Sequence, residues 1–551
     1  MKLLSAFVLL CSVALQAQPY VNYRGIVNAA SFTPPGPSGS EIAQGSIFSI
    51  FGRGLGPTTL AQVSAFPLST TLAGVSVKVT QGSKSVDAFP LVVTAGQINA
   101  IMPSNAPLGR VSINVTFGGS TSNPGTAMVA PSGFGIFAVN SGGFGPGVFQ
   151  NYIAQANQPI NSLTAAAAPG QVITLWGTGL GPVPADNVAP TPGNLPTPVE
   201  VFVGGQLASN LYSGRSPCCS GVDQIVFKVP DNAPPGCYVP VQIRTGQTIL
   251  SNSVTMAIQK GGAGCSDPAN PISMAFMKGG KLGLAVLSRS EAYFDVDTTL
   301  PLDVTEDLGV LSMRTAPGGG FFFNPAVSAP PAGACTTYTI SGTRPLFSVP
   351  DFFGGLGMEL DAGVNINVSG LTTATITRAT TTPLYAAVLG TNDPVFGPSG
   401  LVINSSGTTS ISAAGGTGVG PFNVNIPAAP ALDWTNRLQI VTIDRSKALS
   451  ITWSTDGLQN GLVMVVGSNY DQPSNTQRTF VCTASGGAGS FTVPAYVLQA
   501  LPASGPNVGQ SSGVLMLGAF PSQNVVPFTA NGLDSGLAVE VVSSSKTVLF
   551  K

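Results

Sequence analysis

Short runs of alternating apolar and polar side chains recur along the whole chain. In residues 46–51 the alternation places Phe48 and Ile50 on one face, and residues 171–176 repeat the pattern with Ile173. Similar runs are 75–80, 97–102, 111–117, 281–287, 364–368, 373–376, 422–426, 438–443, 449–453, 462–466, 490–493 and 515–517. Glycine, proline and small polar residues separate them, and only 493–501 suggests a helical turn. The pattern predicts an all-β chain of short strands, as in β-sandwiches.

A segment near the start of the chain is repeated about 125 residues later. Residues 42–57 read IAQGSIFSIFGRGLGP, and residues 167–182 read AAPGQVITLWGTGLGP. The offset of 125 grows to 127 from Leu68, which aligns with Leu195, and to 129 where residues 122–123 align with 251–252. Loop insertions between fixed strands explain both shifts. The sequence therefore predicts a duplicated domain of about 125 residues.

The repeat defines the domain organisation that we expect. The predicted parts are a signal peptide over 1–17, an immunoglobulin-like domain over 24–133, a second over 134–260, and a β-rich region over 266–551. The last part follows a glycine-rich linker and carries strand-like runs without a copy of the repeat. We expect one or two further β-sandwich domains there, with a division near 380–400 in the second case. The fold class is thus all-β, with tandem immunoglobulin-like β-sandwiches at the start.

Three segments of the repeats resemble a known family. They are NAASF at 28–32, QINAIMP at 97–103 and PGQVITLWGTGLGP at 169–182. The chain resembles IPT/TIG immunoglobulin-like domains, and it is more closely similar to a group of uncharacterised secreted acidobacterial proteins with duplicated domains of this kind. The resemblance is strongest over about 24–260. It implies roles in adhesion, in receptors or as accessory modules of polysaccharide enzymes, and it carries over no catalytic residues.

Residues 1–17 have the charge and hydrophobicity of a secretory signal. Lys2 supplies the positive start, and residues 3–15 form a short apolar core. This core is too short to cross a bilayer, and no later segment reaches about 18 uninterrupted apolar residues. We therefore expect a secreted or cell-surface protein without membrane insertion.

The cysteine count is typical of an exported chain. Cys11 lies in the predicted signal, and the remaining six cysteines are an even number, which indicates disulfides. Sequence proximity favours a bond between Cys335 and Cys482. The other four would then pair among themselves: Cys218, Cys219, Cys237 and Cys265. We expect structural roles for these bonds, because the Cys-x-x-Cys spacing of redox sites is absent.

Charged residues are scarce and scattered. They make up 8% of the chain, against about 25% in ordinary soluble proteins. Because 43% of residues are hydrophobic, the scarcity does not indicate disorder. The net charge is −1, and the basic residues form no stripe of the kind that binds phosphates. We therefore expect no nucleic-acid partner.

The chain contains no histidine, which excludes Ser-His-Asp and Cys-His catalysis and histidine-ligated zinc. Two carboxylates would suffice for glycoside hydrolysis. The densest acidic segment contains Glu291, Asp295, Asp297, Asp303, Glu306 and Asp307. In a strand over 293–297, Asp295 and Asp297 would share a face and are candidates for binding Ca²⁺. We favour a charged strand edge, because the spacing matches no calcium loop.

Three tryptophans are candidates for stacking against sugar rings. Trp176 aligns with Phe51 of the first copy, Trp453 alternates with apolar neighbours, and Trp434 lies among polar residues. Because aromatic side chains dominate the burial in protein cores, we expect core packing for all three.

These observations favour a non-enzymatic modular protein outside the cell, one that serves adhesion or the recognition of a surface polysaccharide or protein. No cofactor is expected apart from the Ca²⁺ candidate. The alternative is a polysaccharide-acting enzyme with catalytic carboxylates in 266–551 and the immunoglobulin-like domains as accessory modules. A structural role in an envelope layer is a third alternative.

Overall fold

The structure is a computed structural model that describes residues 18–246, 249–294, 302–341, 357–379, 385–393, 395–504 and 513–551. Within these ranges the regular structure is almost entirely β-strand, which confirms the all-β fold class. The short helical elements are α1 (Pro271–Lys278), α2 (Ala495–Gln499), and 3-10 turns at Arg437–Gln439, Gly486–Ala488 and Ser522–Asn524. In the described part, no helix is long and apolar enough to span a bilayer. The predicted signal peptide at 1–17 and the calcium candidates Asp295 and Asp297 lie outside the described residues.

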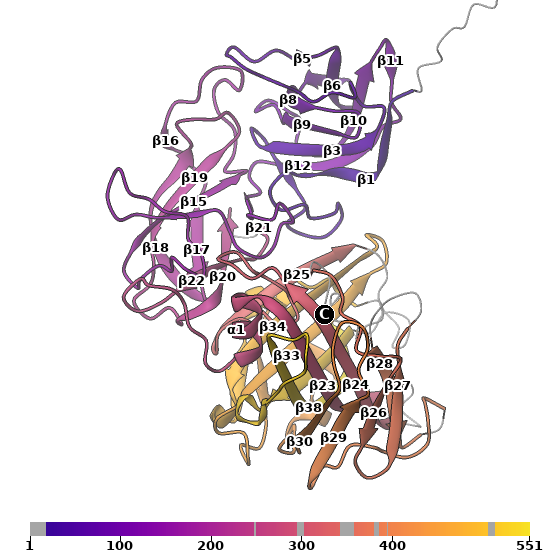
Figure 1. Cartoon of the computed structure of the whole chain (residues 1–551). Helices are drawn as coiled ribbons and strands as arrows, with labels where there is room; N and C mark the ends of the chain where they lie inside the picture. The colour runs from indigo at the N-terminus through magenta and orange to yellow at the C-terminus, as the bar shows by residue number, and fades with distance from the viewer. Residues whose placement is uncertain are drawn as a thin grey trace, which may run out of the picture.

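The first copy of the repeat is a sandwich of two sheets, drawn in indigo in Figure 1. One sheet has the order β1 (Tyr20–Asn28), β3 (Ile47–Arg53), β9 (Gln97–Ile101), β8 (Phe89–Val93) and β4 (Ala61–Gln62). The other has the order β2 (Ile42–Ala43), β12 (Gly125–Ala130), β10 (Gly109–Phe117), β6 (Val75–Gln81) and β5 (Thr71–Leu72), with β11 (Ser120–Thr121) on β10 and β7 (Lys84–Asp87) on β6. The core between the sheets is built by alternate side chains such as Phe48, Ile50, Val77 and Val79.

The second copy has the same plan with one change. Its strands run in the order β13 (Gly135–Ile136), β15 (Val172–Thr178), β19 (Asp223–Lys228), β18 (Gln206–Arg215), β17 (Val199–Val203), β20 (Gly236–Thr245) and β21 (Ile249–Leu250), with β14 (Phe149–Asn151), β16 (Gly193–Asn194) and β22 (Val254–Ile258) paired at their sides. The long strand β18 pairs with β17 through its first residues and with β19 through its last. It therefore joins the two layers into one continuous sheet.

The strand register shows that the two copies are equivalent. In the first copy Ile47 pairs with Ile101, and in the second Val172 pairs with Lys228, at the offsets of 125 and 127 that the sequence predicts. The pairing of Gly109 with Val129 in β10 and β12 recurs between β20 and β22. There, however, one extra residue forms a bulge in β20 that contains Cys237.

The repeated Ser-Asn pair ties an outer strand to each sandwich. The side chain of Asn123 accepts from the backbone N–H of Val21 at 2.8 Å and donates to its carbonyl at 3.0 Å. Asn252 makes the same two bonds to Ile136, at 2.8 and 2.9 Å. An amide side chain thus replaces a missing ladder partner in both copies.

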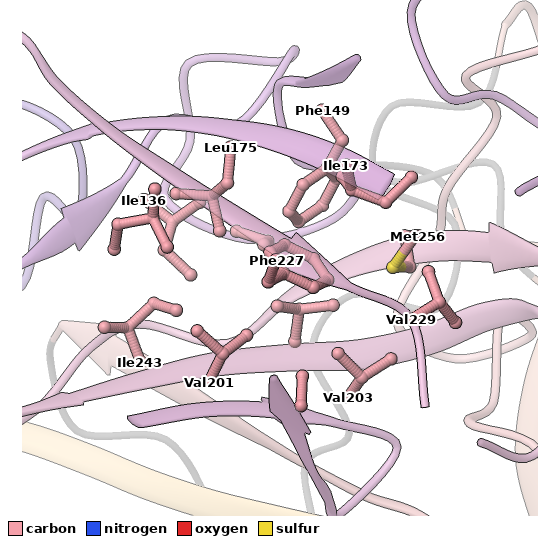
Figure 2. Packing of buried hydrophobic residues seen from close by; sticks show 14 of the residues in the cluster. Ile136, Phe149, Ile173, Leu175, Val201, Val203, Phe227, Val229, Ile243 and Met256 are labelled. Atoms are coloured by element: carbon pink, nitrogen blue, oxygen red, sulfur yellow. The ribbon is translucent and has the colours of Figure 1, made fainter. Parts of the chain in front are cut away.

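Figure 2 shows the core of the second copy, where side chains of β15 face those of β17 and β20. Ile173 and Leu175 are fully buried, as their alternation predicts. Phe149 and Phe227 pack edge to face between the layers, with ring centroids 6.5 Å apart.

Buried polar groups hold the two copies against each other. Arg215 forms an ion pair with Asp223, and both side chains are almost fully buried. The guanidinium of Arg215 also donates to the carbonyls of Gly45 in the first copy (3.1 Å) and Gly181 in the second (2.7 Å). The backbone N–H of Ile47 donates to Thr178 at 2.8 Å. The second copy thus covers the outer face of β3, which explains why that strand is buried on both sides.

The remaining chain forms a ten-stranded sheet and two smaller ones. The large sheet has the order β25 (Cys335–Ser341), β34 (Thr476–Ser485), β33 (Leu462–Asp471), β36 (Gly513–Phe520), β38 (Ser535–Phe550), β23 (Gly280–Phe294), β24 (Leu302–Ala316) and β28 (Tyr385–Thr391), with β31 (Thr442–Ile443) and β37 (Val526–Phe528) on β38. The smaller sheets are β27 (Thr373–Thr377), β26 (Asn365–Ser369), β29 (Thr408–Ala413) and β30 (Phe422–Pro427), and the pair β32 (Leu449–Thr452) and β35 (Ser490–Val493).

Both faces of the large sheet are covered. On β23, Leu282 and Leu284 pack against α1 and against Tyr238 of the second copy. Ala285 and Leu287 point to the opposite face and pack against the small sheet of β26, β27, β29 and β30. Strands from both sides of residues 380–400 pair in this one sheet, so a division at that point would separate strands that share it. The domain limits themselves stay a prediction.

Two local predictions need correction. Residues 438–443 do not form a strand throughout, because a 3-10 turn occupies Arg437–Gln439 and only Thr442–Ile443 pairs, with β38. The helix α1 was not predicted, although its signals are present. The side chain of Asn270 accepts from the N–H of Ser273 at 3.1 Å, and Pro271 follows at the first helical position.

Candidate functional site

A cavity of about 450 Å³ lies where the two copies and the C-terminal region meet, and we call it the junction pocket. Its volume is in the range of about 300–1,000 Å³ that is usual for small-molecule sites. The side chains that matter below are Phe32 and Ser38 of the first copy, Phe144 and Arg244 of the second, and Tyr338, Arg445, Arg478, Tyr496 and Gln499 of the C-terminal region.

The first copy contributes the NAASF segment that follows β1. The side chain of Asn28 accepts from the backbone N–H groups of Ala30 at 2.9 Å and Ser31 at 3.2 Å, which turns the chain sharply. Phe32 then adopts a φ of 51°, in the left-handed region that is unfavourable for a residue with a side chain. The turn places Phe32 in the wall of the pocket.

The second copy contributes the loop that carries Phe144. The amide of Asn252 donates at 2.8 Å to the carbonyl of Gly143, beside its bonds to β13. The ring of Phe144 packs edge to face on Tyr338, with centroids 6.4 Å apart, and lies 6.1 Å from Phe323. Because 36% of Phe144 remains exposed, the ring is accessible to a ligand.

Arg478 is the most deeply buried charge in the pocket wall. It lies on β34, and only 8% of the residue is exposed. Its Nη1 donates to the carbonyl of Ala500 at 2.8 Å and its Nη2 to that of Ser38 at 2.7 Å, whereas its buried Nε has no partner. Burial lowers the pKa of Arg478 to about 10, against the opposing attraction of Glu41 and Asp471. The group is therefore still a cation at neutral pH.

Arg445 is a second cation in the same wall. Its Nη1 donates to the carbonyl of Leu501 at 2.7 Å, and its Nε is buried without a partner. Burial lowers its pKa as well. Among the residues that the structure describes, no carboxylate lies within 4 Å of either Arg445 or Arg478.

The third arginine of the pocket lining, Arg244, has a carboxylate partner. Arg244 forms an ion pair with Glu200 at 2.6 Å, and this hydrogen bond lowers the pKa of the Glu200 carboxyl. The guanidinium lies 5.2 Å from the ring centre of Phe202. Phe202 also stacks on Tyr496 of α2, with centroids 5.0 Å apart. Burial raises the pKa of Tyr496 to about 12, so its hydroxyl keeps its proton and can donate.

The predicted site residues lie elsewhere. The disulfides are Cys335–Cys482, Cys237–Cys265 and Cys218–Cys219. The first joins directly paired residues of β25 and β34. The second joins the bulge of β20 to the segment before α1, within the cluster that links the second copy to the large sheet. The third joins adjacent residues in the exposed loop between β18 and β19.

Trp434 and Trp453 pack in the core as predicted, Trp176 does not belong to a core cluster, and none of the three lines the junction pocket. Trp434 is 5% exposed and Trp453 is 4% exposed, and both belong to the core around Cys335–Cys482. Their indole N–H groups donate to Asn436 and Gly486. Trp176 is half-buried and donates to Gln150. Trp434 is thus a core residue, not an exposed platform for sugars.

Glu291, Asp303 and Asp307 of the acidic segment are engaged in structural contacts. Glu291 and Asp303 lie 3.6 and 3.5 Å from Arg437. Asp307 is fully buried and accepts from Arg289 at 2.8 and 2.9 Å. In the described part of the chain no aspartate or glutamate lines the junction pocket, and no group of three or more potential metal ligands occurs.

No family model and no curated protein matches the chain. Among solved structures, the extracellular region of plexin A4 aligns at 13% identity and a TM-score of 0.17, over 44% of this chain and 18% of plexin. A tetra-tandem repeat from a large adhesion protein aligns at 12% identity and a TM-score of 0.13, over 92% and 96%. SGBP-B from a xyloglucan utilization locus of Bacteroides uniformis aligns at 11% and 0.16, over 97% and 94%. Because such TM-scores do not show a shared fold, the fold rests on the strand pairing above.

Proposed function

We propose that this chain is a secreted or cell-surface recognition protein that binds a surface polysaccharide in the junction pocket. The observation that carries the proposal is the lining of this pocket. Accessible or half-buried aromatic rings, Phe32, Phe144 and Tyr496, stand beside hydroxyl and amide groups such as those of Ser38 and Gln499. Sugar rings present apolar faces rimmed by hydroxyl groups, so rings and hydrogen-bonding groups together suit them.

The joints between the parts support a preformed site. Cys237–Cys265 holds the second copy to the C-terminal region, and Phe202 stacks on Tyr496 across the same boundary. Arg478 reaches from β34 to the carbonyl of Ser38 in the first copy. Because walls that are already fixed lose little conformational freedom on binding, they favour affinity.

The compartment and the family are part of the proposal. The six cysteines outside 1–17 form three disulfides, which supports export, since such bonds persist outside the cytosol. The segments 28–32, 97–103 and 169–182 support membership of the IPT/TIG-like group of secreted acidobacterial proteins. Adhesion to a polysaccharide-coated surface is the role that we propose.

A pocket-filling variant tests the site. Gln499 is exposed on α2 and lines the pocket, so Gln499→Trp should obstruct it without touching the core. We expect the intact chain to be retained by at least one polysaccharide in affinity electrophoresis, and the variant to lose that retention at least tenfold. Gln155→Trp, at an exposed position of the second copy outside the pocket, is the matched control.

Two results would contradict this proposal. Equal retention of Gln499→Trp and the intact chain would place the binding surface elsewhere. Release of saccharide during incubation, abolished by a single Asp or Glu substitution in 266–551, would favour the enzyme alternative.

A further inference from the structure

We infer that the ligand of the junction pocket is an acidic saccharide, whose ring carboxylate is held by Arg478 and Arg445. The inference rests on the proposed function and names the class of polysaccharide. It starts from the charge distribution of the pocket wall. Arg478 and Arg445 both belong to the lining of a cavity whose described lining contains no carboxylate.

Arg478 lacks a counter-charge at its own contacts. Both of its hydrogen bonds go to neutral carbonyls, and its Nε–H is buried without an acceptor. A buried N–H that has no acceptor destabilises a protein by roughly 1–3 kcal/mol, more when the group is charged. Nε–H and a remaining N–H of the neighbouring Nη form a pair of parallel donors, the geometry that binds a carboxylate through both oxygens. A ligand carboxylate in the cavity would supply the counter-charge that this guanidinium lacks.

Arg445, in the segment after β31, also lacks a counter-charge at its own contacts. Its one hydrogen bond also goes to a carbonyl, and its Nε is buried without an acceptor. The nearest acidic groups to Arg478 are Glu41 and Asp471, and each is already engaged, with the N–H groups of Gly39 and Ser474 respectively. The two arginines therefore leave positive charge in the pocket for a ligand to balance.

The rest of the lining favours a saccharide over a bare anion or a peptide. A phosphate or sulfate ion would contact the arginines alone and cover none of the surface that the rings of Phe32 and Phe144 leave exposed. A peptide carboxylate would occupy the arginines, but a peptide backbone presents no apolar ring face rimmed by hydroxyl groups to the aromatic and polar side chains of the lining. A sugar acid uses all three features: carboxylate on the arginines, ring face on an aromatic group, hydroxyls on Ser38 and Gln499.

The test compares an acidic oligosaccharide with its uncharged ester. Trigalacturonate and fully methyl-esterified trigalacturonate, which differ in the carboxylate charge and in the ester methyl groups, are titrated into the intact chain by calorimetry. We expect trigalacturonate to bind and the ester to bind at least tenfold more weakly. Arg445→Gln, at a half-buried position, should weaken trigalacturonate binding at least fivefold and leave the ester unaffected. Arg478→Gln should have a larger effect if tryptophan fluorescence shows that it folds.

Arg110→Gln is the matched control, because Arg110 is exposed on the first copy and lies outside the pocket. Equal affinities for acid and ester, together with an unchanged Arg445→Gln, would overturn the inference and leave the proposed function standing. Failure of both oligomers to bind would also overturn it, whereas the proposed function is judged separately by Gln499→Trp. Stronger binding of a peptide with a free C-terminal carboxylate than of trigalacturonate would replace the saccharide by a peptide.

Discussion

Glu540 should make the stability of the C-terminal region depend on pH between about 5 and 8. The residue lies on β38 and is 1% exposed. Its Oε1 accepts from the backbone N–H of Ala429 at 3.1 Å, and its buried Oε2 has no partner. The nearest cation, Arg289, is already paired with Asp307. Burial therefore dominates and raises the pKa of Glu540 from 4.5 to about 7.

The sign of the effect follows from the two states. Below pH 4.5 the carboxyl is protonated in both the folded and the unfolded chain, and the stabilisation is fully present. Between 4.5 and about 7 the unfolded chain releases this proton and the folded chain keeps it, so the free energy of unfolding falls as pH rises. A pKa shift of one unit corresponds to about 1.4 kcal/mol, so the shift from 4.5 to about 7 lowers the free energy of unfolding by about 3 kcal/mol. Partial solvent screening reduces this loss to about 2 kcal/mol.

The perturbation is Glu540→Gln, which keeps the shape of the side chain and removes the proton equilibrium. Urea unfolding at pH 5 and pH 8, followed by fluorescence of the buried Trp434 and Trp453 in the same region, gives the free energies. We expect the intact chain to lose about 2–3 kcal/mol more than the variant over this interval. The chain has no histidine, which removes the group that usually titrates in this range.

Glu200→Gln is the control, because pairing with Arg244 lowers the pKa of Glu200 and places its titration below this interval. It should therefore leave the loss between pH 5 and pH 8 as large as in the intact chain. An identical pH dependence of Glu540→Gln and the intact chain would refute the reasoning, because Glu540 would then ionise as it does in the unfolded state.

Two further predictions concern the bonds that hold the parts together. The double substitution Cys335→Ala and Cys482→Ala removes a disulfide that spans 147 residues of sequence. The loop-entropy relation predicts that the free energy of unfolding, measured by urea unfolding, falls by about 5 kcal/mol. A loss below about 1 kcal/mol would show that the bond does not constrain the unfolded chain. Asp223→Asn leaves Arg215 buried without its counter-charge. We expect the free energy of unfolding to fall by about 3–5 kcal/mol, measured by urea unfolding with the fluorescence of Trp176 in the second copy as the signal. Asp87→Asn, which breaks the exposed pair with Lys78, should change stability by less than about 1 kcal/mol, and an equal loss in both variants would contradict a special role for burial.

The β-strands of the repeats could be predicted because their signal is local and occurs twice. Alternation places Phe48 and Ile50, and in the other copy Ile173 and Leu175, in the two cores. The offset between copies shows which residues are equivalent, and the strand register agrees with it in both copies. The joining of both layers through β18 was not predictable in this way, because it depends on where a long strand bends.

The junction pocket was not predicted, because its walls come from segments more than 400 residues apart, such as Phe32 and Arg478. One local signal was present. On β34, Arg478 shares its face with the buried Phe480 and Cys482, since side chains of a strand alternate. An arginine on the inward face of a strand, beside a cysteine, is unusual enough to mark a site. The counter-groups that would identify the site lie on other elements, so the sequence alone could not name them.

Because charged residues are scarce in this chain, two arginines without a carboxylate partner, Arg478 and Arg445, are a notable feature of the structure. In a chain with 8% charged residues, the buried Arg215 and the half-buried Arg289 are matched by the carboxylates of Asp223 and Asp307. Arg478 and Arg445 break this pattern, and they do so in the wall of the same cavity. Burial of unmatched charge destabilises the fold, and a carboxylate brought by a ligand would remove part of that penalty. Binding of an acidic ligand should therefore raise the melting temperature of the whole chain, by an amount that Arg445→Gln reduces.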